Sequence, residues 1–236
     1  MAFELTNELS FVTILTFGFV LGLKHAVEAD HLAAVSTIVA ERKSAISSAL
    51  VGGFWGVGHT VSLLLVGAFV VFLKLRISST LEARLEAVVG IMLVLLGLNA
   101  IRKLWKKNQI HIHTHEHDGH EHIHVHTHEA EKKAVSHHIA SFSPRSLAIG
   151  MVHGLAGSAA LMLLIVPTIS TPTVALLYIF TFGLGSIGGM MLMSFLVGLP
   201  LHLTAGRYIL LNRGMLLVAG LFSCGLGMFI VYEKMA

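Results

Sequence analysis

Four ionisable side chains occur within seven residues of an otherwise apolar stretch: His25, Glu28, Asp30 and His31. Imidazole and carboxylate groups together suit Ni, Co, Zn, Fe or Mn ions. On a regular helix, at about 100° per residue, His25, Glu28 and His31 fall within an arc of about 120°, and Asp30 lies about 100° from His31. Ionisable groups inside a membrane span are costly and usually mark a pathway or a site. The pattern predicts a metal site, the alternative being hydrogen bonds that hold helices together.

Two further histidines lie in apolar segments. His59 is flanked by Gly56 and Gly58, and we expect these glycines to permit close approach of its helix to His25 and His31. A lone membrane histidine also serves as a hydrogen-bonding partner between helices. His153 is predicted to be a second-half ligand or a proton relay, with a structural hydrogen bond as the alternative. The candidate metal ligands are therefore His25, Glu28, Asp30, His31, His59 and His153.

The composition determines what kind of elements position these residues. The chain has 236 residues, of which 55% are hydrophobic and 12% charged, with a mean hydropathy of +0.80. Soluble domains have about 25% charged residues. These values exclude a disordered chain, a coiled coil and a typical soluble enzyme. They predict an all-α polytopic membrane protein with about six transmembrane helices of about 20 residues each.

The apolar segments show where these helices are expected. They are residues 9–40, 46–73, 85–104, 146–169, 173–200 and 212–232. The first is too long for one span, which needs about 20 residues, and its middle is polar. We predict one tilted or broken helix with the polar cluster at mid-depth. The first ten residues hold no Lys or Arg, so no cleaved signal peptide is expected.

The two halves of the chain resemble each other. Matching segments recur at offsets of 127 to 130 residues: 22–25 with 150–153, 56–58 with 183–185, and 90–97 with 220–227. A repeat of three spans reverses its orientation between copies, which predicts two inverted three-helix repeats, as in many secondary transporters. The expected organisation is a first membrane repeat at 1–104, a linker at 105–145 and a second membrane repeat at 146–236.

The linker is rich in histidine. It holds eleven of the 16 histidines, between His111 and His138. We expect no core there, and the histidines predict a metal reservoir or sensor, or only a solubilising loop. Of the 16 Lys and Arg residues, eleven lie on the inner side and four on the outer side if both termini are outside, with Lys24 in the membrane. This distribution predicts outside termini and a cytoplasmic linker in the cell membrane.

The motifs resemble those of a known family. His25-x4-Asp30-His31 and Gly58-His59-Thr60 are similar to two signatures of the nickel/cobalt transporter superfamily. That resemblance implies roles in metal selection and transport for these histidines and the aspartate. In the second half, residues 151–158 (Met-Val-His-Gly-Leu-Ala-Gly-Ser) replace the acidic motif of the nickel permeases and look like the UreH-type branch.

The expected function is secondary transport of nickel or cobalt, by alternating access around a midplane site. The UreH-like second half and the small size favour uptake. Protonation of Asp30, Glu28 or a histidine is a hypothesis for proton coupling. We expect Ni²⁺ or Co²⁺ as substrate without a permanently bound cofactor. The expected partners are membrane lipid and a metal-delivery client on the cytoplasmic side, but no nucleic acid.

Three alternatives remain open at this point. Exporters share the site motif, so nickel or cobalt efflux is the first. The second is a membrane protein that stores or senses metal through its linker. The third is an intramembrane metalloenzyme, although the protease pattern His-Glu-x-x-His is absent. A transporter rather than an enzyme is the prediction.

Overall fold

A computed structural model describes residues 2–40, 42, 44–73, 78–106, 111–117, 120–126, 143–156, 169, 171–205 and 208–236. The helices are α1 (Ala2–His25), α2 (Ala29–Val39), α3 (Ala45–Leu73), α4 (Ser79–Lys106), α5 (Pro144–Ala156), α7 (Pro172–Ala205) and α8 (Ile209–Met235). Two strands, β1 (His111–His117) and β2 (His120–His126), lie in the linker.

The helices are long and apolar enough to cross a bilayer. Within the described residues, four helices pass this test, namely α3, α4, α7 and α8, and the bent pair α1–α2 makes a fifth. A polytopic helical membrane protein, as predicted from composition, is confirmed. The predicted segment 146–169 is described as helix α5 up to Ala156, and 157–168 lie outside the described residues.

The polar cluster coincides with a break in the first span. Helix α1 ends at His25 and α2 begins at Ala29, with a bend of 57° between them. Glu28 is extended, with φ −64° and ψ 152°, although no proline or glycine lies between the helices. The prediction of a tilted or broken helix is confirmed in its broken form. The placement on one regular helix is wrong, because the break separates His25 from His31.

Close backbone contacts join the helices at glycines. A Cβ at Gly22 would lie 2.0 Å from the Phe182 carbonyl oxygen, and a Cβ at Gly150 would lie 2.0 Å from the Trp55 carbonyl oxygen. Only glycine permits these approaches of α1 to α7 and of α5 to α3. The two contacts are equivalent under the sequence offsets, since 150 − 22 is 128 and 182 − 55 is 127.

The glycines beside His59 have other partners than expected. Cβ atoms at Gly56 and Gly58 would meet Ile187 of α7 and the Leu147 carbonyl of α5, at 2.9 and 2.1 Å. The expectation that they admit the helix bearing His25 and His31 is therefore wrong. They set the distance of α3 from the second half of the chain.

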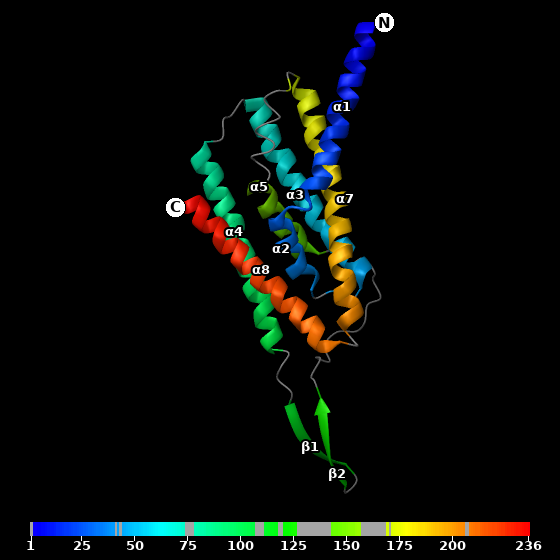
Figure 1. The fold of residues 1–236 in the computed structure, drawn as a ribbon, viewed down its shortest axis with the longest axis vertical. Helices are drawn as coiled ribbons and strands as arrows, with labels where there is room; N and C mark the ends of the chain where they lie inside the picture. The colour runs from blue at the N-terminus through cyan, green and yellow to red at the C-terminus, as the bar shows by residue number, and fades with distance from the viewer. Residues whose placement is uncertain are drawn as a thin grey trace.

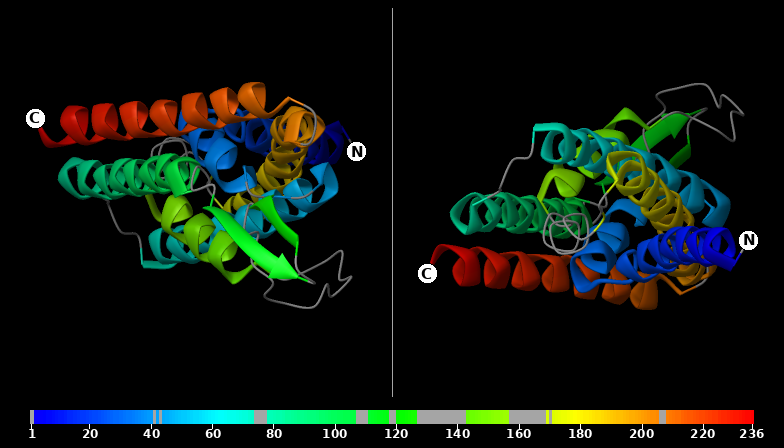
Figure 2. Two further views of the ribbon diagram at one scale, coloured as in Figure 1. Left: turned by 90° about the horizontal axis from the view of Figure 1, so that it is seen from below. Right: turned by 90° about the horizontal axis from the view of Figure 1, so that it is seen from above.

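The arrangement places α3 along α7 and α4 along α8, with α2 against α8 (Figures 1 and 2). The main buried cluster lies among α2, α3, α4 and α7, around residues such as Ala33, Trp55, Leu93 and Met190. The N-terminus and the linker strands lie at opposite ends of the long axis (Figure 1).

The linker strands form an antiparallel hairpin in a segment where no regular structure was expected. Its register pairs histidine with histidine at four positions: His111 with His126, His113 with His124, His115 with His122, and His117 with His120. Alternate residues of a strand share a face. The spacing of the histidines therefore places these eight residues on one face of the hairpin.

Candidate metal centre

Four histidines from four helices meet in the middle of the bundle. His25 ends α1, His31 lies in the first turn of α2, His59 is in α3 and His153 is in α5. All four have 0% exposure. Their rings form a continuous group in which His31 lies 4.3 Å from His25 and 4.2 Å from His153, between ring centroids. The structure thus brings together all the histidines that the sequence singled out as ligands.

Asp30 joins two of these histidines. Its Oδ1 accepts a hydrogen bond from the His31 backbone N–H at 2.8 Å and lies 2.9 Å from His31 Nδ1. Its Oδ2 lies 2.9 Å from His153 Nε2, on the other half of the chain. A carboxylate in the first turn is also stabilised by the helix dipole, which favours the start of α2 here. Asp30 therefore fixes the rings of His31 and His153 relative to each other.

Several ring nitrogens face the cluster without a partner. Within the described residues, the buried nitrogens that lack a hydrogen bond and lie beyond ion-pair distance are His25 Nε2, His31 Nε2, His59 Nδ1, His59 Nε2 and His153 Nδ1. Leaving a buried polar atom unpaired costs about 1–3 kcal/mol. Lone pairs of neutral imidazoles are also the ligands that Ni, Co and Zn ions take. The donor set therefore fits a divalent transition-metal ion.

The potential ligands form two overlapping groups. The first is His25, His31 and His59, and the second is Asp30, His31 and His153. Within each group, one candidate ligand atom from every residue lies within 4.8 Å of the others. We call them the first and the second triad. His31 belongs to both.

Glu28 lies at the edge of this cluster. Its Oε2 is 3.0 Å from His25 Nδ1, outside hydrogen-bonding geometry, and its side chain is 41% exposed. It belongs to neither triad. Of the predicted ligands, Glu28 is therefore the one that the structure places beside a histidine rather than among the converging donors.

Two aromatic side chains enclose the histidines, and the sequence analysis assigned them no role. Trp55 lies 5.3 Å from His31 and 5.5 Å from His153, and Phe182 lies 5.4 Å from His25, between ring centroids. Both are buried. They are 127 residues apart, the same offset as the glycine pairs. That offset is the signal that could have identified them as matching walls of one site.

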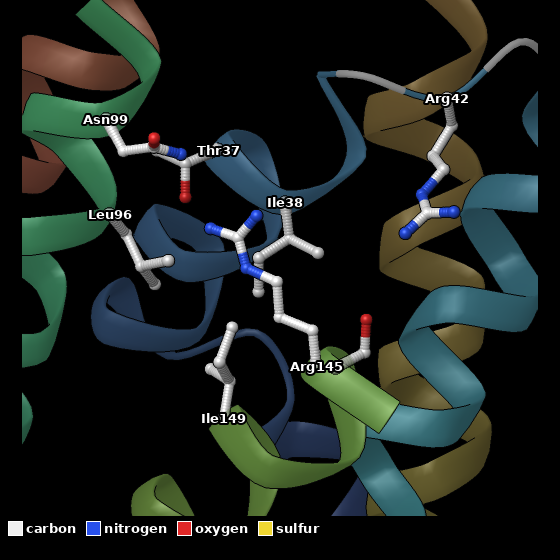
Figure 3. Close-up of a pocket in the computed structure, with 8 residues that line it drawn as sticks. Thr37, Ile38, Arg42, Leu96, Asn99, Arg145 and Ile149 are labelled. Carbon is white, nitrogen blue, oxygen red and sulfur yellow. The ribbon is translucent and has the colours of Figure 1, made fainter. Parts of the chain in front are cut away.

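A small cavity lies beyond the second triad, between α2, α4 and α5. It has a volume of about 30 Å³, and its lining includes Thr37, Asn99, Arg145 and Ser146. Figure 3 shows the Arg145 guanidinium extending from the start of α5 toward Thr37. Ile149, one turn before His153, also lines it. The cavity therefore adjoins the histidine cluster on the side of the linker.

Together, the membrane-spanning helices and the buried histidine–aspartate cluster define a polytopic membrane protein with a candidate intramembrane metal centre. A comparison with curated proteins finds 40% identity over 231 residues with the urease accessory protein UreH of Bacillus sp. (strain TB-90), covering 96% of this chain and 94% of that protein. The chain belongs to the UreH family, as its motifs predicted. No protein-family model matches the chain, and no solved structure matches it.

Proposed function

We propose that this protein is a secondary transporter that carries Ni²⁺, and with it Co²⁺, across the cell membrane into the cytoplasm. One observation carries the proposal: four fully buried histidines and Asp30 converge at a break in a membrane helix. Broken helices at mid-depth bind ions in many carriers. The name of the UreH relative links it to urease, which favours nickel and uptake.

The ligand chemistry supports a transition metal over the common hard cations. Mg²⁺ and Ca²⁺ prefer oxygen ligands. Here imidazole nitrogens outnumber carboxylates, with four histidines to one aspartate among the triads. Nickel, cobalt and zinc bind such ligands with overlapping affinities. The urease link of the relative is therefore what selects nickel within this group.

The proposed cycle is alternating access of two inverted three-helix repeats. It is supported by contacts that recur under the repeat offset. The packing of α1 on α7 has its counterpart in the packing of α5 on α3. In the same way, a Cβ at Gly97 would meet the Gly220 carbonyl, and one at Gly227 the Gly90 carbonyl, at 2.5 and 2.4 Å. The site lies where the two repeats meet.

The proposed orientation places the N-terminus outside and the linker in the cytoplasm. The excess of Lys and Arg on the linker side supports it. So does the position of the N-terminus and the hairpin at opposite ends of the molecule (Figure 1). In this orientation, the linker histidines meet nickel after it has passed the membrane.

The test measures radioactive nickel in cells that lack their own nickel transporters. Empty vector, wild type, His25→Ala and His202→Asn are compared, the last as a control because His202 is exposed and lies outside the cluster. Uptake requires accumulation above vector that His25→Ala abolishes and His202→Asn retains. Accumulation below vector with increased nickel resistance would instead establish efflux. Equal nickel in all four strains, with the protein present in the membrane, would refute nickel transport.

A further inference from the structure

The two triads offer one ion two positions. They share His31, whose ring centroid lies between those of His25 and His153 at 4.3 and 4.2 Å. One ring edge of His31 is engaged, since Nδ1 lies 2.9 Å from Asp30. The other edge carries Nε2, which has no partner in the described chain. The nitrogen left free by Asp30 is thus available to the first triad.

The two positions are approached from opposite ends of the molecule. Helix α1 runs from the N-terminal end of the bundle to His25, and α5 runs from the linker end to His153 (Figure 1). The cavity beside Arg145 and Ser146 lies on the α5 side (Figure 3). The first triad is therefore nearer in sequence to the N-terminal side, and the second to the linker side.

We propose that the ion occupies the two triads in succession and remains bound to His31 throughout. Entering from the N-terminal side, it binds His25, His31 and His59. It then exchanges His25 and His59 for Asp30 and His153, and leaves toward the linker. The inference rests on the proposed function, because it describes how the same ion passes the same cluster. A shared ligand also limits the cluster to one ion at a time.

The physical reason for a shared ligand is the cost of a bare charge. An ion that left all its ligands in a low-dielectric interior would lose stabilisation of tens of kcal/mol. Keeping one imidazole bound while two ligands are exchanged avoids that state. Asp30 supplies a negative charge at the second position only, which favours forward transfer of a divalent cation. His59 and His153 are therefore ligands of different steps, although both lie next to His31.

The test uses the purified full-length protein in detergent, with Co²⁺ as the probe because its visible spectrum reports the ligand set. Bound cobalt is counted by equilibrium dialysis for wild type, His31→Asn, His59→Asn, His153→Asn and the control His202→Asn. The His31→Asn protein is the reference that subtracts cobalt held by the linker histidines. Elution volume in size-exclusion chromatography confirms folding, and glutamine variants replace any asparagine variant that aggregates.

We expect wild type, His59→Asn, His153→Asn and His202→Asn each to bind one more Co²⁺ than His31→Asn. The His59→Asn and His153→Asn spectra should differ from each other, because each retains a different triad. Neither should transport Ni²⁺ in sealed vesicles, whereas His202→Asn should.

Three binding results would overturn the proposal. They are two extra ions in wild type, loss of the ion from both His59→Asn and His153→Asn, or identical spectra for those two variants. The first would mean independent sites, and the others a single site. Failure of the proposed function has a different signature: wild-type vesicles would not transport Ni²⁺, whatever the cobalt spectra show.

Discussion

Replacing Gly150 with alanine tests the contact that holds α5 against α3. The added Cβ would lie 2.0 Å from the Trp55 carbonyl oxygen and 2.8 Å from the Trp55 ring. An ordinary contact begins at 3.4 Å, so the helices must separate by up to 1.4 Å. Overpacking of this kind costs about 1–3 kcal/mol. The carbonyl is backbone and has no rotamer to change, so we expect the upper part of that range.

The expected result is a lower unfolding temperature and a loss of transport. A cost of about 2 kcal/mol corresponds to about 4–8 °C in a chain of this length. The separation also moves His153 away from His31, and a displacement of about 1 Å in a site can cost 100-fold in rate. Thermal unfolding in detergent, at one fixed scan rate, and nickel uptake measure the two effects.

Gly225→Ala is the matched control, because a Cβ at Gly225 would meet nothing within 4 Å. Both variants gain the helix propensity of alanine, about 1 kcal/mol, so that gain cancels in the comparison. If Gly150→Ala unfolds at the temperature of Gly225→Ala and transports nickel at the same rate, the α5–α3 contact is not as described here. The reasoning about helix distance would then be wrong.

Three further outcomes are expected. Asp30→Asn should weaken Ni²⁺ binding by 10- to 100-fold, since it removes the charge and loosens His31 and His153, which isothermal calorimetry can measure; unchanged affinity would contradict the assigned role. Arg145→Gln should speed release toward the linker by removing a positive charge from the path of a divalent cation, in vesicles preloaded with radioactive nickel; slower release would contradict it. Deleting residues 108–138 should leave a reduced but measurable uptake, whereas a storage or sensing protein would lose its function.

The sequence predicted the class of the protein and the identity of the clustered histidines for clear physical reasons. Few charges and long apolar runs leave only membrane helices. The offset between His25 and His153 indicated that ligands from both halves would meet, and the structure places both in one cluster. Ionisable residues in a membrane span have few places to go except a shared interior.

The details of that cluster depend on contacts that no local pattern contains. The break lies at Ala-Val-Glu, residues with no intrinsic tendency to end a helix, so its position follows from the tertiary bonds of Asp30. The partners of Gly56 and Gly58 depend on how the two halves pack. Trp55 and Phe182 look like ordinary apolar residues until they are seen beside the histidines.

The unpaired ring nitrogens of the cluster have a consequence for the kinetics of the carrier. Each buried nitrogen without a partner raises the free energy of the empty protein by about 1–3 kcal/mol. An ion relieves that cost, so the loaded carrier is favoured and resists thermal unfolding. The empty carrier must still reorient to accept the next ion. We therefore expect its return to limit turnover, so that exchange of labelled for unlabelled nickel runs faster than net uptake.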